Sequence, residues 1–180
     1  MGRITLPPPA KLIIGFIFQN KDSYDKALLP LEKKFGSIDF QSPILGFNYT
    51  DYYKEEFGDG LNKKFISFKK LIPAQQLPQI KIFANKLEEK FSFGGKRLVN
   101  IDPGCLTLAK LVLATTKDYA HRIYLGKGIF AEVTLFYEKN SFEPGKWTYR
   151  DYQTKDYKQI FNQIRDIYAQ QIKLCHCEGE

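Results

Sequence analysis

The residues of this chain whose types suit chemistry lie between positions 96 and 136. Asp102, Pro103 and Gly104 follow a short apolar stretch. Proline fixes φ and glycine permits positive φ, so these three residues predict a sharp turn at the end of a strand. Thr107 then stands where the N-cap of a helix belongs. A glycine turn ahead of a helix N-terminus leaves free backbone N–H groups that face one point, which suits an anion.

The first functional hypothesis is therefore a site for a small anionic ligand that bears a phosphate or a carboxylate. Lys117 and Arg122 would neutralise this ligand, and Glu132 would orient Arg122 from across a hairpin. Asp102 and His121 are acid/base candidates, and the sequence does not decide whether the protein is an enzyme. The predicted site has Asp102 and His121 as catalytic candidates and Asn100, Gly104, Thr107, Lys117, Arg122, Glu132, Asp51 and Tyr52 as ligand-binding candidates.

Simpler structural roles compete with each of these assignments. Asp102 before Pro-Gly is a common turn-forming residue. His121 shares a predicted strand face with apolar residues, which favours a histidine at the edge of the core over a general base. Cys105 could be a nucleophile with His121 as its base, but a buried small residue is the simpler interpretation because no third orienting group can be named. The stretch at 51–56 is interpreted more simply as a solvated, aromatic-rich helix start.

Several common cofactor and catalytic motifs are missing from the sequence. A P-loop needs Gly-x-x-x-x-Gly-Lys-Ser/Thr, because its backbone N–H groups wrap a phosphate. The Gly-Lys pairs that begin at Gly95, Gly126 and Gly145 lack both the upstream glycine and the following Ser or Thr. The Gly-x-Gly-x-x-Gly, Gly-x-Ser-x-Gly and paired His-x-Thr/Ser motifs are also absent. The sequence therefore assigns no cofactor.

Composition predicts one domain and a polyanion-attracting surface. The chain has 180 residues, a net charge of +7 and a pI of about 9.2, but its lysines form no run of five or more. Three cysteines without a disulfide framework suit a reducing compartment. No apolar run reaches eighteen residues and no signal segment is found, so a cytoplasmic location without a membrane partner is expected. Cys175-His176-Cys177 is interpreted as part of a flexible tail, and no metal site is predicted.

The elements that must position the candidate site follow from apolar periodicity. The order is β-α-β-β-α-β, followed by a helix, a hairpin and an amphipathic helix, and the first six elements match a ferredoxin-like split β-α-β pattern. The predicted fold class is a single α+β domain at 11–174, with an extended lead-in at 1–10 and a flexible tail at 175–180. The main predictions are a central strand at 12–18, a helix at 24–35, strands at 38–47 and 63–71, a helix at 80–91, a helix from 107, a loop at 139–155 and a helix from Thr154.

The predicted hairpin has a three-residue loop, Gly126-Lys127-Gly128. This register places Tyr124 opposite Phe130 and forms a cross-strand pair between Arg122 and Glu132.

Several segments of the chain resemble an uncharacterised bacterial family, the domain of unknown function DUF4416. They are FNYTDYY at 47–53, VNIDPG at 99–104, KLVLATTKD at 110–118, HRIYLG at 121–126 and WTY at 147–149, and the resemblance covers residues 9–174. Membership implies a small bacterial protein. Some members are labelled GTP-binding proteins, a label that the missing P-loop does not support here. Cys105 stands where the family pattern has an aromatic residue.

Two further hypotheses belong to other functional classes. One is a basic RNA- or ribosome-associated module, with Lys63, Lys64, Lys69 and Lys70 on an exposed strand and aromatic residues for stacking. The other is a structural or assembly partner without a catalytic site. A polar pocket around Asp102 would favour the ligand site, a contiguous positive face the nucleic-acid module, and an exposed apolar patch the assembly partner. The sequence does not give the oligomeric state.

Overall fold

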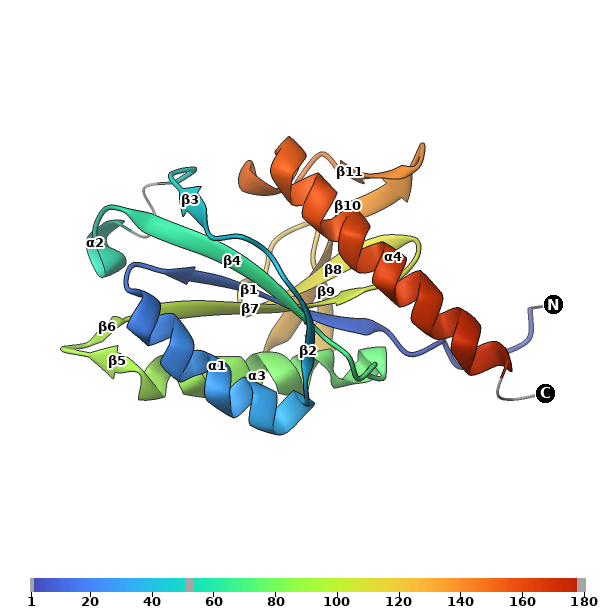
Figure 1. Ribbon diagram of the computed structural model, residues 1–180, viewed down its shortest axis with the longest axis horizontal. Helices are drawn as coiled ribbons and strands as arrows, with labels where there is room; N and C mark the ends of the chain where they lie inside the picture. Colours follow the sequence, from blue (N-terminus) through green and yellow to red (C-terminus); the bar gives the residue numbers. More distant parts are fainter. Residues whose placement is uncertain (1, 51–53, 178–180) are drawn as a thin grey trace.

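The structure, a computed structural model, describes residues 2–50 and 54–177 (Figure 1). Its strands are β1 (Lys11–Phe18), β2 (Ile38–Gln41), β3 (Leu45–Phe47), β4 (Leu61–Phe68), β5 (Ser92–Phe93), β6 (Lys96–Arg97), β7 (Val99–Leu106), β8 (Lys110–Thr115), β9 (Ile123–Gly126), β10 (Ile129–Glu138) and β11 (Ser141–Pro144). Its helices are α1 (Lys21–Phe35), α2 (Lys54–Phe57), α3 (Leu77–Lys90) and α4 (Lys155–Cys177), with short 3-10 turns at Ala74–Gln76 and Asp151–Gln153.

One antiparallel sheet organises these elements in the order β11-β10-β8-β7-β1-β4-β2, with β3 added to β4 and β9 added to β10. The part β7-β1-β4-β2 has the strand order of a ferredoxin-like split β-α-β unit, with α1 and α3 as its two crossover helices. In Figure 1 these two helices run along the bottom of the molecule and α4 crosses its upper right. The predicted α+β class is confirmed.

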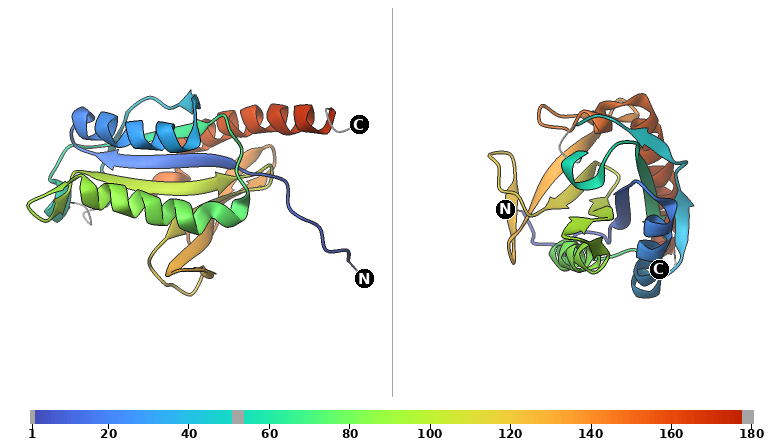
Figure 2. Two further views of the ribbon diagram at one scale, coloured as in Figure 1. Left: turned by 90° about the horizontal axis from the view of Figure 1, so that it is seen from below. Right: turned by 90° about the vertical axis from the view of Figure 1, so that its left-hand side faces the viewer.

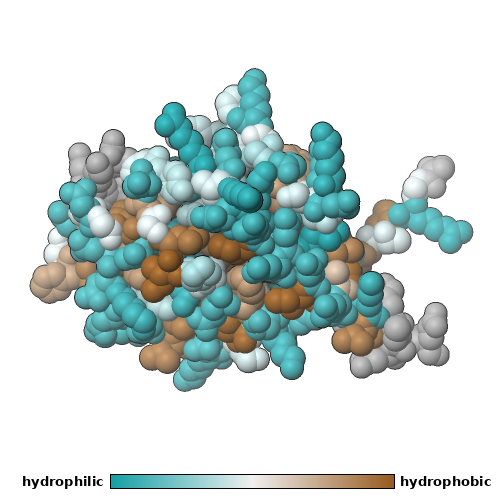
Figure 3. Space-filling view, turned by 45° about the horizontal axis from the view of Figure 1, so that its top comes forward, coloured by the Kyte–Doolittle hydropathy of each residue, from teal (hydrophilic) through white to brown (hydrophobic). Residues whose placement is uncertain are grey.

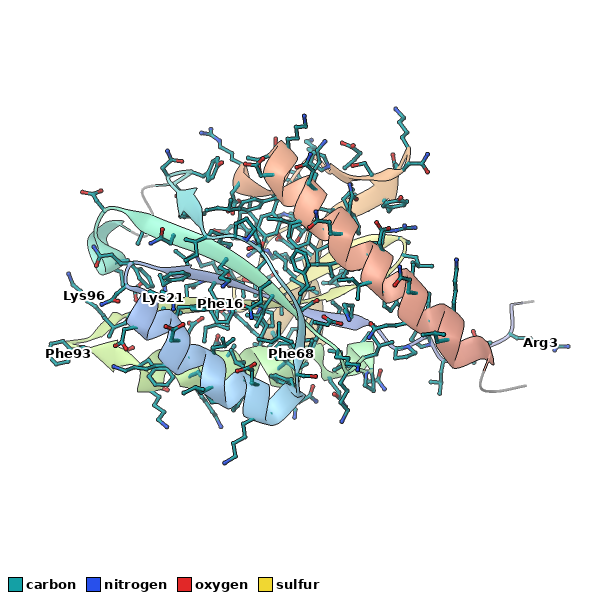
Figure 4. The ribbon with its side chains drawn as sticks, in the orientation of Figure 1. Arg3, Phe16, Lys21, Phe68, Phe93 and Lys96 are labelled. Atoms are coloured by element: carbon teal, nitrogen blue, oxygen red, sulfur yellow. The ribbon has the colours of Figure 1, made fainter. Side chains whose placement is uncertain are left out.

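The strand β1 is the centre of the core, and all eight of its residues are buried. Leu12, Ile14, Phe16 and Phe18 belong to the cluster that α1 and α3 cover, whereas Ile13 belongs to the cluster under α4. Phe16 and Phe68 point from the sheet towards α1 (Figure 4), where their rings meet Tyr24 and Phe35. This confirms the prediction of a strand that is covered on both faces.

The helix α4 follows its predicted pattern. Thr154 caps its first turn, because its hydroxyl accepts a hydrogen bond from the backbone N–H of Tyr157 at 3.4 Å. The buried stripe packs on Phe65 and Leu135 and consists of Tyr157, Ile160, Phe161, Ile164 and Tyr168. The helix extends through Cys177, so helical backbone enters the segment that was predicted as a tail.

The predicted turn at 102–104 and the helix from Thr107 are wrong. Asp102, Pro103 and Gly104 lie inside β7 and pair with β1, and the segment predicted as a helix is β8. Thr107 lies in the tight turn between these strands, where its N–H donates to the carbonyl of Lys110 at 2.9 Å. The spacing of apolar residues in β8 is compatible with a strand as well as with a short helix. Local spacing alone therefore predicted the wrong element for this segment.

Other sequence predictions also need correction. Lys63 lies on β4, an inner strand, and is 2% exposed, so β4 is not the exposed lysine-bearing strand of the nucleic-acid hypothesis. The hairpin does pair Tyr124 with Phe130, but Gly126 pairs with Ile129 and the register shifts next to it. The pairing of Gly126 with Ile129 leaves a two-residue loop, Lys127-Gly128, and a bulge beside it, in place of the predicted three-residue loop. The segment at 139–155 contains β11 as well as loop.

Hydrophilic residues cover most of the face seen in Figure 3, and apolar residues form a band among them. The β9–β10 end of the sheet projects away from the body in Figure 2.

Candidate functional site

The strands β7 and β8 form a fork. Their pairing covers Gly104–Leu106 and Leu111–Leu113. A Cβ on Gly104 would lie 2.7 Å from both the Cδ2 of Leu113 and the carbonyl oxygen of Val112, so glycine permits the close approach of the two strands. Towards the start of β7 the strands separate.

Side chains from α3 bond the backbone of β7 inside this fork. Glu88 Oε1 accepts a hydrogen bond from the N–H of Ile101 at 2.6 Å, and Lys81 Nζ donates to the carbonyl of Ile101 at 2.9 Å. Alternate residues of a strand direct their backbone groups to the same side, so the nitrogen of Pro103 faces the fork as well. Proline is accommodated there because no partner strand requires its missing N–H.

The fork opens into a cavity of about 790 Å³. Its lining comes from β1, β3, β4, β6, β7, β8, β10 and α3, from residues 49–50, from the segment 116–122 after β8 and from the segment 148–152 ahead of α4. Five of the predicted site residues line it together, namely Asn100, Asp102, Lys117, Arg122 and Glu132.

Asp102 is the hydrogen-bonded centre of the cavity. Lys81 Nζ lies 3.3 Å from its Oδ1, Asn100 donates to its Oδ2 at 2.6 Å, and Lys63 Nζ lies 4.0 Å from the same Oδ2. Burial alone would raise the pKa of Asp102, but the charges of Lys81 and Lys63 and the two hydrogen bonds outweigh it and lower that pKa. The carboxylate is therefore held in its ionised form.

Asp151 is a second carboxyl group in the same cavity, and its pKa is shifted in the opposite direction to that of Asp102. It is 6% exposed, and burial raises its pKa although the charge of Lys63 partly opposes the shift. The environments of Asp102 and Asp151 thus move two carboxyl pKa values apart, an arrangement that can divide acid and base roles between two groups. The sequence prediction missed Asp151 because it lies in a segment that was assigned to a loop.

Lys63 is a deeply buried cation of the cavity. It is 2% exposed, and its ammonium lies over the rings of Phe47, Phe65 and Tyr152 at 5.4 to 5.6 Å from their centres. Its 4.0 Å separation from Asp102 is longer than a hydrogen bond. Cation–π contacts offset part of the cost of burying this charge.

Arg97 connects the cavity to α2 and α3. Its guanidinium donates two hydrogen bonds to Glu56, both at 2.7 Å, one to Glu88 at 3.0 Å and one to Asn100 at 2.9 Å. These bonds, above all those to Glu56, raise the pKa of Arg97. Neither this arginine nor its glutamate partners could be selected from sequence, because the three elements meet only in the folded chain.

The predicted pair of Arg122 and Glu132 is present. Arg122 Nε donates to Glu132 Oε2 at 2.8 Å, and the guanidinium also donates to the carbonyl of Lys117 at 2.9 Å and to the hydroxyl of Tyr149 at 2.5 Å. The same guanidinium lies 4.6 Å from the ring centre of Tyr119. Arg122 therefore ties three segments of the cavity wall together.

His121 contacts the same carboxylate from the other side. Its Nε2 lies 3.1 Å from Glu132 Oε2, and its ring stacks between Tyr119 and Trp147. It lines a separate groove of about 430 Å³, whose exposed apolar side chains include Ile123 and Phe136. The acid/base assignment of His121 stays a prediction.

The remaining candidates lie elsewhere. Gly104 and Thr107 are not among the residues that line the cavity, and the helix N-terminus that would have made them an anion site does not exist. Asp51 and Tyr52 lie outside the described residues. Cys105 is 4% exposed in the core, and burial raises its pKa to about 12, so its thiol does not suit a nucleophile.

A family model for a domain of unknown function, DUF4416, matches residues 8–168. The chain belongs to the DUF4416 family. This confirms the resemblance drawn from the sequence motifs. The matched range of this DUF4416 chain includes every described residue that lines the cavity. No curated protein and no solved structure gives a significant match.

Two further properties concern only the described part of this DUF4416 chain. None of its helices has the length and apolar character needed to span a membrane. No group of three or more His, Cys, Asp or Glu side chains within 2–50 and 56–174 is arranged to hold a metal ion.

Proposed function

We propose that the cavity between β7 and β8 binds a small anionic ligand through Lys63. The carrying observation is that Lys63 is buried in this cavity without a carboxylate at hydrogen-bonding distance among the described residues. A buried charge is costly unless it is paired at short range, so an anionic group of a ligand would stabilise this site.

The charge of the cavity wall supports the proposal. Among the described lining residues, six are cationic and four are acidic: Lys63, Lys81, Arg97, Lys117, Arg122 and Arg150 against Glu88, Asp102, Glu132 and Asp151. Burial raises the pKa values of Glu88 and Asp151, which lowers the tendency of these two acids to carry negative charge. The potential in the cavity therefore favours anions.

The volume of the cavity is also suitable for a small-molecule ligand. Sites for small molecules typically enclose about 300 to 1,000 Å³ and combine apolar walls with a few polar groups. This cavity of about 790 Å³ offers the rings of Phe47 and Tyr149 beside its charged groups. A nucleic-acid interface of the kind expected from sequence would instead need β4 lysines on the surface, and Lys63 is inside.

The test is a thermal-shift and calorimetric screen with inorganic phosphate, small carboxylates, sugar phosphates and mononucleotides. Lys63→Met keeps the apolar stem of the side chain and removes its charge, so we expect ligand affinity to fall about tenfold or more. The matched control is Lys64→Met, because Lys64 is the next residue of β4 and its ammonium lies over Tyr24. Equal ligand affinity in wild type and Lys63→Met would refute the proposal, as would binding of an RNA oligonucleotide with no response to the small-anion panel.

A further inference from the structure

Two residues that line the cavity each carry a buried polar atom without a hydrogen-bond partner among the described residues, and the two atoms are of opposite character. One is the hydroxyl of Tyr152, a residue that is 2% exposed. The other is Oε1 of Glu132, a residue that is 5% exposed. Buried polar atoms are normally hydrogen-bonded, and leaving one unpaired costs about 1 to 3 kcal/mol. Such atoms in a cavity mark positions where a ligand can supply the missing hydrogen bond.

The Tyr152 hydroxyl is a donor for an anion. Burial, and next the charge of Asp151, raises the pKa of Tyr152 well above its ordinary value, so the proton stays on the oxygen. The ammonium of Lys63 lies 5.5 Å from the centre of the same ring. A cation over the face of this ring and the protonated hydroxyl at its end can each bind one oxygen of the same phosphate or carboxylate.

The free oxygen of Glu132 is an acceptor and would repel an anion. Its other oxygen already receives Arg122 Nε at 2.8 Å, so the charge of the carboxylate is neutralised within the protein. The group that suits Oε1 is therefore a neutral N–H or O–H donor.

Lys63 and Glu132 contact different sides of the cavity. They stand on β4 and β10, which are separated in the sheet by β1, β7 and β8. Neighbouring strands lie about 4.8 Å apart, so a lone phosphate or acetate cannot reach both groups.

We infer that the ligand is an elongated polar anion, with its anionic group on Lys63 and Tyr152 and a neutral hydrogen-bond donor on Glu132 Oε1. This inference rests on the proposed function and names its ligand class. Sugar phosphates and mononucleotides belong to this class, whereas inorganic phosphate and fatty acids do not.

Tyr152→Phe tests the anion end of the site. The substitution retains the ring contacts with Phe65 and Phe161 and removes an unpaired hydroxyl, so the melting temperature should be unchanged or higher. Affinity for the best sugar phosphate or mononucleotide should fall about tenfold. Tyr157→Phe is the matched control, because its hydroxyl is also buried and unpaired but is not part of the cavity lining. Equal effects of the two substitutions on affinity would overturn the assignment of Tyr152.

Glu132→Gln tests the donor end. The amide can still accept from Arg122 while presenting an N–H₂ to the cavity, so donor-bearing ligands should bind about tenfold more weakly. Inorganic phosphate can occupy only the anion end of the site, on Lys63 and Tyr152, so its affinity should be the same in the variant and in wild type. This result also reports that the variant is folded. Unaltered affinity for the donor-bearing ligand would overturn the inference. It would leave the proposed function intact as long as Lys63→Met still weakens ligand binding about tenfold or more.

Discussion

Glu88 of α3 accepts the backbone N–H of Ile101 of β7 at 2.6 Å, a bond that an adjacent strand would ordinarily make. Its other oxygen receives Arg97 at 3.0 Å, and Lys81 lies 3.9 Å away. The side chain of Glu88 thus takes the place of a hydrogen-bonding partner on β8, at a part of β7 where the two strands are not paired. The cavity exists because of this substitution of partners.

Glu88→Ala should lower the free energy of unfolding by about 3 kcal/mol, because it leaves the N–H of Ile101 unpaired and removes a partner from the buried Lys81 and the half-buried Arg97. Urea unfolding followed by circular dichroism measures the change. Glu89→Ala is the control, since the neighbouring glutamate is exposed and should change stability by less than about 0.5 kcal/mol. Similar stabilities of the two variants would show that the fork does not depend on Glu88.

Gly104→Ala should destabilise the fold by about 2 kcal/mol or more, because the new Cβ would overlap the side chain of Leu113 and the backbone of Val112. Gly46→Ala provides the comparison, as a Cβ at that strand position meets nothing within 4 Å. Thermal unfolding of both variants would separate the two cases. A melting temperature of Gly104→Ala equal to that of wild type would contradict the close approach of β7 and β8.

Cys105 should resist alkylation by iodoacetamide at about pH 8. With its pKa raised to about 12 by burial, its thiolate fraction there is on the order of one part in ten thousand. Peptide mapping by mass spectrometry distinguishes Cys105 from Cys175 and Cys177, and the same reaction in denaturant supplies the fully labelled reference. Rapid labelling of Cys105 in the folded protein would restore it as a candidate nucleophile.

Asp151→Asn should change stability in a pH-dependent way. Burial raises the pKa of Asp151 in the folded state, so the native protein binds this proton more tightly than the unfolded chain. Ionisation of Asp151 therefore lowers the stability of wild type as pH rises through and above 3.8, the ordinary pKa of an aspartate. Asparagine does not ionise, so the variant does not lose this stability. We expect it to gain stability relative to wild type near neutral pH and to lose this advantage in acid.

Glu56→Gln should show the opposite trend. The hydrogen bond from Arg97 lowers the pKa of Glu56, so its contribution to stability is present above the ordinary value of 4.5 and disappears as pH falls through the folded-state value. The variant should be less stable than wild type near neutral pH and approach it in acid. Urea midpoints measured between about pH 3 and pH 7 test both trends, and parallel curves for the two variants would contradict them.

Local pattern was sufficient for much of the fold. The apolar run of β1, the helical stripe of α4 and the order of the first six elements follow from periodicities that neighbouring residues carry themselves. The pairing of Arg122 with Glu132 also follows from local sequence, because a hairpin brings together residues that are close along the chain.

The tertiary structure decided the rest, since it depends on contacts between distant residues. Asp-Pro-Gly has the composition of a turn, yet β1 pairs with it and α3 bonds the strand beside it, and these partners hold it extended. Lys63 has the alternation of a surface lysine, but β1 and β3 pair with β4 on either side of it and the residue is buried. Sequence alone determined which residues would be strands, helices and polar candidates in the well-patterned segments. Only the folded chain could determine that Lys63, Tyr152 and Glu132 share one cavity, because no local periodicity encodes the meeting of β4, β10 and the segment ahead of α4.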